Sequence, residues 1–247
     1  MYVCLKNVFG SDDLDKILLQ EYASLDVDHQ ELYRLVAALE SMGARVHRQL
    51  VLRITHIDAG SLLSLLVAVE GIIDEYVVGD EREGIYRWST RHPVIADIIT
   101  DYKYADEDEL YSLLQNVVSA LNPLVFIERK TIADICDRDR GIGRLSDDER
   151  QVELYRELIE LAPGERVPRH RLIAKLLAMN ALERASMAVR SAQEAVGVDP
   201  PISNFKVRLD VARAEQTMGI QLEDRKKGDP AEGSKDCAAR LKTLFRR

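Results

Sequence analysis

The sequence predicts a mostly helical fold that contains a single β-hairpin. Two apolar runs, Ile72–Val78 and Ile85–Trp88, flank a polar turn bounded by Gly79 and Gly84, which is the pattern of a hairpin. Most other segments repeat their apolar residues every three or four positions, as amphipathic helices do. The 247 residues are enough for two small domains, each with its own core, or for one large domain.

Short helical patterns come before the hairpin, and their order predicts the architecture of this part of the chain. They cover residues 11–25, His29–Ser41, Val46–Ile54 and Ala59–Val69, the last of them with Asp58 as a cap. Three short helices followed by a hairpin are the order of a winged helix. We therefore expect a winged-helix domain at residues 26–90, preceded by an N-terminal helix within residues 1–25.

The rest of the chain is predicted to be helical. Helical patterns start at Pro93 and then cover Asp106–Leu121, Thr131–Asp137, Glu149–Leu161, Arg169–Met179, Leu182–Val196 and Ile202–Thr217. A glycine-containing loop, Asp137–Leu145, separates a helical linker at residues 91–145 from a region of helical hairpins at residues 146–222. The tail at residues 223–247 holds eight Lys and Arg against five Asp and Glu, so we expect a flexible basic segment, with a short helix at Cys237–Phe245.

Composition and charge favour a cytoplasmic protein that does not bind nucleic acid generally. The formal net charge is −8, whereas neutralising a phosphate backbone needs local Lys and Arg. The three cysteines, Cys4, Cys136 and Cys237, include no C-x-x-C pair and predict reduced thiols. No run of 18 apolar residues is present, so no membrane span is expected.

One passage resembles a known class of signalling proteins. Ile85–Ile99 reads IYRWSTRHPVIADII and is similar to the end of the winged helix in STAND-class ATPases, where the last strand runs into a Met-His-Asp-type motif and an apolar helix. The family's histidine contacts the phosphate of bound ADP, so the resemblance implies a nucleotide-sensing role for His92, with Arg91 beside it able to pair with a phosphate. Arg91 replaces the family's Met, and Pro93 replaces its Asp.

A second passage resembles the tetratricopeptide repeat. Leu154–Gly164 looks like the end of such a repeat, where an apolar helix closes on a proline, and Pro163 and Pro200 lie 37 residues apart, near the 34-residue period. Repeat folds bind proteins, which implies a protein partner and a binding role for Tyr155, Leu172 and Leu176. The alternative for these three residues is the core of the repeats. Leu172 stands where the repeat's first helix has an aromatic residue.

The sequence holds no recognisable catalytic centre. The G-x-x-x-x-G-K-[ST] loop is missing, so no nucleotide cofactor is expected unless the chain is joined to an ATPase core that binds ADP or ATP. His47, His56 and His170 are scattered, and no metal-ligand set or G-x-S-x-G motif occurs. We therefore expect no enzyme. The opening helix and the basic tail fit a piece cut from a longer coding frame.

The leading hypothesis is a non-catalytic regulatory and protein-interaction module, similar to the switch-and-sensor half of a STAND ATPase. The resemblance also permits a part in defence signalling. The alternative is a winged-helix DNA-binding transcriptional regulator, for which Arg45, Arg48 and Arg53 are the candidate contacts. Against DNA, the presumed recognition helix Ala59–Val69 lacks Lys, Arg, Asn and Gln, and the wing tip at residues 80–83 is net negative. An enzyme of another type is the third hypothesis.

Overall fold

The computed structural model describes residues 11–79 and 84–228. The described chain is mostly helical with one small antiparallel sheet, which confirms the predicted fold class at that level. The chain forms two compact units, residues 1–175 and 176–247, and the division falls inside helix α10 (Arg166–Ala178). Among the described residues, no helix combines the length and apolar character needed to cross a membrane.

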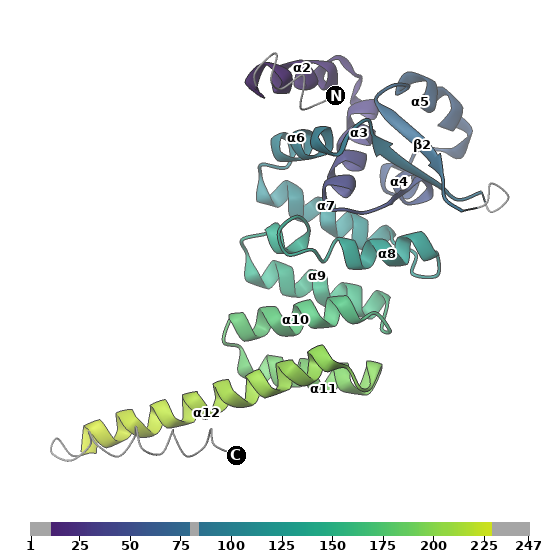
Figure 1. Ribbon diagram of the computed structural model, residues 1–247. Helices are drawn as coiled ribbons and strands as arrows, with labels where there is room; N and C mark the ends of the chain where they lie inside the picture. Colours follow the sequence, from purple (N-terminus) through teal and green to yellow (C-terminus); the bar gives the residue numbers. More distant parts are fainter. Residues whose placement is uncertain (1–10, 80–83, 229–247) are drawn as a thin grey trace. The chain divides into compact units, whose positions relative to one another are not determined.

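In the first unit, helices before the hairpin lie beside the sheet, whereas the first described helix lies apart from it (Figure 1). The elements in order are α2 (Ser11–Ser24), α3 (Val27–Ser41), β1 (Val46–His47), α4 (Arg48–Thr55), η1 (Ala59–Ser61), α5 (Leu62–Ala68), β2 (Ile73–Val77) and β3 (Tyr86–Thr90). Asp26 caps α3, because its side chain accepts a hydrogen bond from the His29 amide at 3.0 Å. Gly43, with a φ of 87°, follows the end of α3. The wing tip at residues 80–83 lies outside the described residues.

The sheet has three antiparallel strands in the order β1-β3-β2. Trp88 of β3 lies opposite Val46 of β1 and Glu75 of β2. The amide of Val78 donates to the carbonyl of Ile85 at 2.9 Å. Because residues that bond to the neighbouring strand alternate with residues that do not, the N–H and C=O groups of Glu75 and Val77 point away from β3, to the outer edge of the sheet. Within the described residues β2 is therefore an edge strand, paired with β3 alone.

Strand β1 was not predicted, and the helix expected from Val46 starts at Arg48 instead. Val46 and His47 are extended and pair with Trp88 and Arg87 of β3. A strand of two residues is too short for an alternating pattern to be visible in the sequence. The tertiary pairing with β3 therefore overrides the local helical pattern at these two positions.

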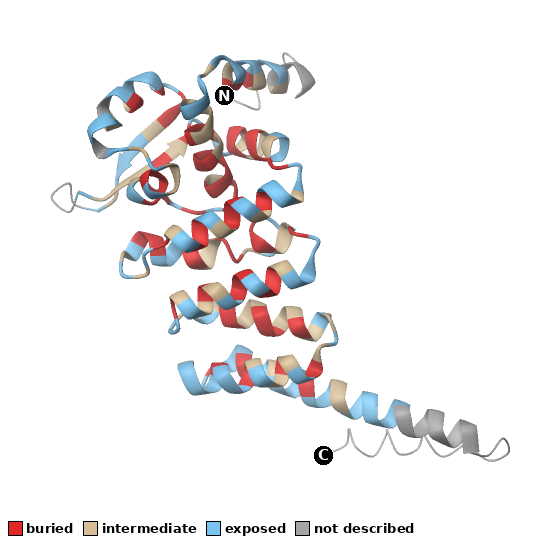
Figure 2. Cartoon of the chain, turned by 180° about the vertical axis from the view of Figure 1, so that it is seen from behind, coloured by how far each residue is buried: buried red, intermediate tan, exposed pale blue. Residues whose placement is uncertain are grey.

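The core of this part lies between α3, the sheet and α6 (Pro93–Lys103), which contact one another. The largest fully buried side chains here are Leu32, Tyr33, Leu35, Leu39, Leu50, Trp88 and Ile99. Figure 2 shows many buried residues on the helices of this part, and on β3 the residues Trp88 and Thr90 are buried while the other three are intermediate. Most of α3 is buried from Leu32 to Leu39, so α3 is a central helix.

Helices continue to the end of the first unit. They are α7 (Glu107–Ala120), α8 (Phe126–Asp134), η3 (Ile142–Arg144), α9 (Asp148–Leu161) and most of α10. Helix α8 begins five residues before the predicted start at Thr131. The reason lies in the preceding turn, where the Leu124 amide donates to the Asn122 side chain at 3.1 Å and the chain enters the helix directly afterwards.

The loop between α8 and α9 is compact. Asp137 accepts hydrogen bonds from the amides of Asp139 and Arg140, both at 2.9 Å, and Ile142 is fully buried. A Cβ atom at Gly141 would lie 2.1 Å from the carbonyl oxygen of Ile135. Gly141 is therefore required for this close backbone approach.

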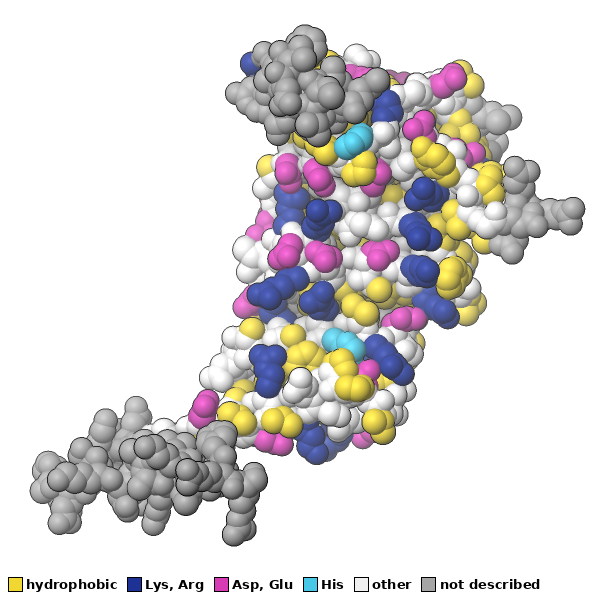
Figure 3. Space-filling model, in the orientation of Figure 1, with side chains coloured by type: hydrophobic (Ala, Val, Ile, Leu, Met, Phe, Trp, Pro, Cys, Tyr) yellow, Lys and Arg dark blue, Asp and Glu magenta, His cyan; other side chains and the backbone are white. Residues whose placement is uncertain are grey.

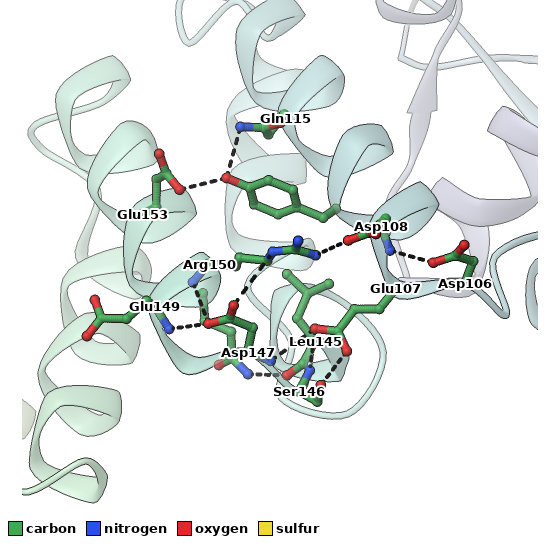
Figure 4. A network of polar contacts seen from close by, with 12 residues as sticks. Asp106, Glu107, Asp108, Gln115, Leu145, Ser146, Asp147, Glu149, Arg150 and Glu153 are labelled. Atoms are coloured by element: carbon green, nitrogen blue, oxygen red, sulfur yellow. Dashed lines mark hydrogen bonds and ion pairs between the residues drawn. The ribbon is translucent and has the colours of Figure 1, made fainter.

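A polar network joins the beginning of α9 to α7 (Figure 4). The Glu107 carboxylate accepts from the amides of Ser146 at 2.9 Å and Asp147 at 3.0 Å, and also from the Ser146 hydroxyl. These donors, the Ser146 side chain first, lower the pKa of Glu107. Arg150 donates to Asp108 at 2.5 Å. The network fixes the first turn of α9 against α7.

Tyr111 adds a second link between the same helices. Its hydroxyl donates to Glu153 of α9 at 2.6 Å and accepts from Gln115 at 2.9 Å (Figure 4). Burial, and then the bond to the Glu153 carboxylate, raise the pKa of Tyr111 to about 12. The Arg150 guanidinium lies 4.8 Å from the centre of its ring.

The second unit is built around α11 (Leu182–Val196) and α12 (Pro200–Gly228), which contact each other. Gly197, with a φ of 69°, ends α11, and the Asp199 carboxylate accepts from the Ile202 amide at 3.1 Å at the start of α12. Helix α12 continues past the predicted end at Thr217 and past the boundary expected after residue 222. The flexible segment expected from residue 223 therefore starts inside a helix, while the predicted helix Cys237–Phe245 lies outside the described residues.

Candidate functional site

His92, the predicted nucleotide sensor, lies at the junction of β3 and α6. It is the N-cap of α6, and its Nδ1 accepts a hydrogen bond from the Val94 amide at 3.2 Å. This bond requires Nδ1 to be unprotonated. The Thr90 hydroxyl donates to the His92 carbonyl at 3.0 Å, so the backbone carbonyl of His92 is hydrogen-bonded as well as its side chain. The side chain is exposed at the positive end of the helix dipole.

Arg91 lies beside His92 but points to another element. Its guanidinium forms an ion pair with Glu21 of α2, and both side chains are partly exposed. An anion that binds Arg91 has to compete with this carboxylate. The two residues are neighbours in the chain, but the His92 side chain is hydrogen-bonded to the backbone of α6, whereas the Arg91 side chain is paired with Glu21 of α2.

The three arginines predicted as DNA contacts do not form one basic surface. Arg48 donates to Glu75 at 3.0 Å, and its guanidinium lies 4.1 Å from the centre of the Tyr86 ring. Arg53 donates to the carbonyl of Ala120 at 2.9 Å and to Glu128 at 2.5 Å. Arg48 and Arg53 therefore pair with carboxylates of the protein itself, and contact of these residues with DNA stays a prediction.

Arg45 is exposed and lines a surface pocket of about 320 Å³ together with Val77, Val78, Gly79 and Arg87. Arg87, which the sequence analysis did not single out, stacks 5.0 Å from the centre of the Tyr76 ring across the hairpin. Predicting the hairpin register would have placed Tyr76 opposite Arg87. On the face shown in Figure 3, Lys and Arg side chains alternate with Asp and Glu on the left, while on the right basic side chains follow one another in a column.

A buried ionic cluster surrounds Glu128 of α8. The fully buried carboxylate accepts from His47 Nδ1 at 2.6 Å, from Arg53 at 2.5 Å and from the Asn122 amide at 2.7 Å. Burial raises the pKa of Glu128, but the donors of His47, Arg53 and Asn122 outweigh it and hold the pKa below its ordinary value. The cluster ties α8 to β1 and α4, and sequence reasoning missed it because the partners are 75 and 81 residues away.

The outward side of η1 and α5 carries no charge. Its exposed residues are Gly60, Ser61, Ser64, Val67 and Ala68. Val67 is 72% exposed. Ser61 and Ser64 also line a surface pocket of about 420 Å³ with Asp28, His29, Thr55, His56, Ile57, Asp58 and Leu65. This side therefore combines an exposed apolar residue with a neighbouring polar pocket that contains two carboxylates.

The predicted protein-binding residues of the repeat region lie inside the protein. Tyr155, Leu172 and Leu176 are all buried, so they serve the core and do not form an accessible surface. Burial raises the pKa of the Tyr155 hydroxyl strongly. Apolar residues at helical spacing fit a core and a binding face equally well, and only the burial in the structure distinguishes the two.

Within residues 11–79 and 84–228, no group of three His, Cys, Asp or Glu side chains is placed to hold a metal ion. Cys136 is fully buried, and burial raises the pKa of its thiol well above the ordinary value. No protein-family model, curated protein or solved structure matches this chain. The residues and their geometry are therefore the basis for assigning a function.

Proposed function

We propose that the chain is a non-catalytic regulatory module that binds another protein, and that residues 26–90 form a winged helix. The element order α3, β1, α4, α5, β2, β3 and the strand order β1-β3-β2 support this assignment. Strand β1 is the third strand that a hairpin alone does not supply. In this assignment α5 takes the place of the recognition helix.

The observation that carries the proposal is the chemistry of the exposed side of α5. Base edges in the major groove are read best by Arg, Lys, Asn and Gln, and the segment Ala59–Val69 has none of these. It exposes Val67 and small uncharged residues instead. A single exposed valine is ordinary on a protein surface, so the support for a protein partner is the lack of base-reading side chains on this segment.

The charges around α5 support the same choice. Asp28 and Asp58 line the adjacent pocket and would repel a phosphate backbone. Arg48 and Arg53 are already paired with Glu75 and Glu128. A partner protein with an apolar side chain flanked by cationic groups fits this surface better than a nucleic acid does.

The spacing of the later helices supports a tetratricopeptide-like region. Helix starts repeat after 34 residues, from residue 148 to residue 182 for α9 and α11, and from residue 166 to residue 200 for α10 and α12. In this assignment Tyr155, Leu172 and Leu176 are the repeat core, and a partner would contact the exposed positions of the same helices.

A switch role of the STAND type is the further part of the proposal. His92 and Arg91 would act on ADP or ATP only in a chain joined to an ATPase core, and this chain supplies no nucleotide loop of its own. The position of His92 at a helix N-terminus supports contact with a phosphate in that setting, because helix N-termini favour anions. A cytoplasmic location belongs to the same proposal.

The test is site-specific photo-cross-linking in cells that produce the full chain. A photoreactive phenylalanine derivative at Val67 is expected to give one cross-linked protein of defined mass. The matched control carries the same derivative at Leu124, which is 93% exposed in the α7–α8 turn and is expected to give none. With the derivative at the exposed Ser64 instead, the Val67→Asp substitution should abolish capture of the same partner.

Two other outcomes would replace this proposal. Salt-dependent binding to duplex DNA, strong at about 50 mM salt and lost in an Arg45→Ala, Arg48→Ala variant, would favour the transcriptional regulator. Nucleotide hydrolysis by the purified chain above that of His92→Ala would favour an enzyme. Failure of the derivative at Val67 to capture a protein, or capture of the same protein from Leu124, would contradict a protein-binding role for α5.

A further inference from the structure

Helix α12 has two apolar sides, and one of them is covered by its own unit. Ile202 and Leu209 are buried, and Arg213 donates to Glu183 of α11 at 3.0 Å. These residues lie along the side that contacts α11. The inner side of α12 therefore completes the pairing of the two helices.

The other apolar side faces solvent. Val207 is 60% exposed, Val211 is 49% exposed and Met218 is 41% exposed, and Ala214 between them is also exposed. At about 100° per residue, Val207 lies about 200° around the helix from Leu209, so this stripe is opposite the side that contacts α11. We call Val207, Val211, Ala214 and Met218 the outer stripe.

The outer stripe has the spacing of a coiled-coil seam. Its members follow one another after four, three and four residues, which are the d-a-d-a positions of a heptad. Figure 2 shows that the residues of α12 before its undescribed side chains are mostly exposed. A long helix with one uncovered apolar stripe gains stability when a second helix covers it.

We infer that the outer stripe binds a second copy of this chain, with the two α12 helices antiparallel. In this register Val207 packs against Met218 of the second copy, and Val211 packs against Ala214 of the second copy. Each layer then combines a larger with a smaller side chain, so the seam fills evenly. The contact is isologous, because each pair occurs twice around a twofold axis.

The charges beside the outer stripe select this orientation. Arg208 and Glu215 are seven residues apart and both follow a d position, so they share one flank of the stripe. An antiparallel pair places Arg208 near Glu215 of the second copy, and symmetry repeats this contact. A parallel pair would instead bring Asp210 against Glu215, two like charges. The flanks of α12 are therefore self-complementary only when the helices run in opposite directions.

The length of the outer stripe limits the expected affinity of the dimer. From Val207 to Met218 the stripe extends about 16 Å at 1.5 Å per residue. A contact of this length is at the small end of specific interfaces, so the dimer is expected to form reversibly at micromolar to submillimolar concentration. The inference is independent of the partner proposed for α5, because it uses residues of the second unit alone.

The experiment is sedimentation velocity of the full chain between about 5 μM and about 500 μM, a range that brackets such affinities. The weight-average mass is expected to rise from 28.0 kDa towards twice that value. Val211→Glu is expected to raise the dimer Kd more than about tenfold, because the seam would bury a carboxylate without a partner. The matched control is Val198→Glu, at a valine that is 95% exposed in the α11–α12 turn, and it should leave the Kd unchanged.

A charge exchange tests the orientation. Arg208→Glu should weaken the dimer, and the double variant with Glu215→Arg should restore it, since the antiparallel contact regains opposite charges. Far-ultraviolet circular dichroism confirms that each variant is folded. A monomer at all concentrations would overturn the inference, and so would a dimer that survives Val211→Glu. A double variant as weak as Arg208→Glu alone would refute the antiparallel pairing.

Discussion

Glu128 provides the sharpest test of how the first unit is held together. The Glu128→Gln substitution keeps the shape of the side chain and removes its charge. The remaining oxygen can accept from Arg53 and the Asn122 amide, while the new amide group faces His47, whose Nδ1 can accept only in the other tautomer. The substitution therefore removes the carboxylate charge that pairs with Arg53 and forces His47 to change its tautomer.

The expected loss of stability depends on how deeply the Glu128 and Arg53 side chains are buried. Removing one partner of a buried ion pair costs about 3–5 kcal/mol, and a hydrogen bond to a charged group contributes about 1.5–3 kcal/mol. Glu128 is fully buried, but the Arg53 side chain is 39% exposed and can regain water. We therefore expect Glu128→Gln to lower the free energy of unfolding of the first unit by about 2–3 kcal/mol.

Urea unfolding followed by Trp88 fluorescence measures this change. Trp88 is the only tryptophan of the chain and is buried in the sheet, so its emission reports on the first unit. With a slope of about 2 kcal/mol per molar urea, the midpoint should fall by about 1–1.5 M. The matched control is Glu21→Gln, which removes the partly exposed ion pair with Arg91 and should cost less than about 1 kcal/mol.

The pH dependence gives a second readout of the same carboxylate. The pKa of Glu128 is lower in the folded chain than its ordinary value of 4.5, so its contribution is present above that value and is lost as the pH falls through the folded pKa. The gap between wild type and Glu128→Gln should therefore narrow from about pH 6 to about pH 3. Equal midpoint shifts for Glu128→Gln and Glu21→Gln, or a gap independent of pH, would refute the reasoning.

Three further predictions concern the helices after the sheet. Gly141→Ala should destabilise the first unit by about 1–3 kcal/mol in the urea assay, because its Cβ would lie 2.1 Å from a backbone oxygen, whereas Gly164→Ala, with no atom within 4 Å, should be nearly neutral. Glu107→Gln should speed hydrogen exchange at the Ser146 amide, and unchanged exchange would contradict the bond drawn in Figure 4. With the other cysteines replaced by serine, Cys136 should react with a thiol reagent only after urea unfolds the chain, and rapid labelling of the folded chain would contradict its burial.

Where a sequence pattern covered several residues, it predicted the type and the approximate bounds of the helix or strand. The hairpin followed from two apolar runs between Gly79 and Gly84, and its strands pair as expected. Helices such as α3 and α9 begin and end within two residues of their predicted bounds. Strand β1 escaped prediction because two residues have no period. The winged-helix and tetratricopeptide-like assignments stay predictions.

Contacts between distant residues were the part that the sequence could not supply. The partners of Glu128 are 75 and 81 residues away, and no local period connects them. The different directions of Arg48 and Arg53 could have been predicted, because five residues turn a helix by about 140° and place the two side chains on different faces. For Tyr155 and Leu172 the sequence allowed two interpretations, a core role and a binding role, because an apolar stripe has the same spacing in a core and on a binding face.

The open edge of β2 affects how the chain behaves when it is crowded. An edge strand can recruit other strands and begin a fibril. The strand is only five residues long, and two of them, Asp74 and Glu75, are carboxylates. If two chains aligned these edges, the Asp74 carboxylates would approach and repel each other, whereas Glu75 is already paired with Arg48. Asp74 thus opposes pairing between edges, and neutralising it would favour strand-by-strand growth.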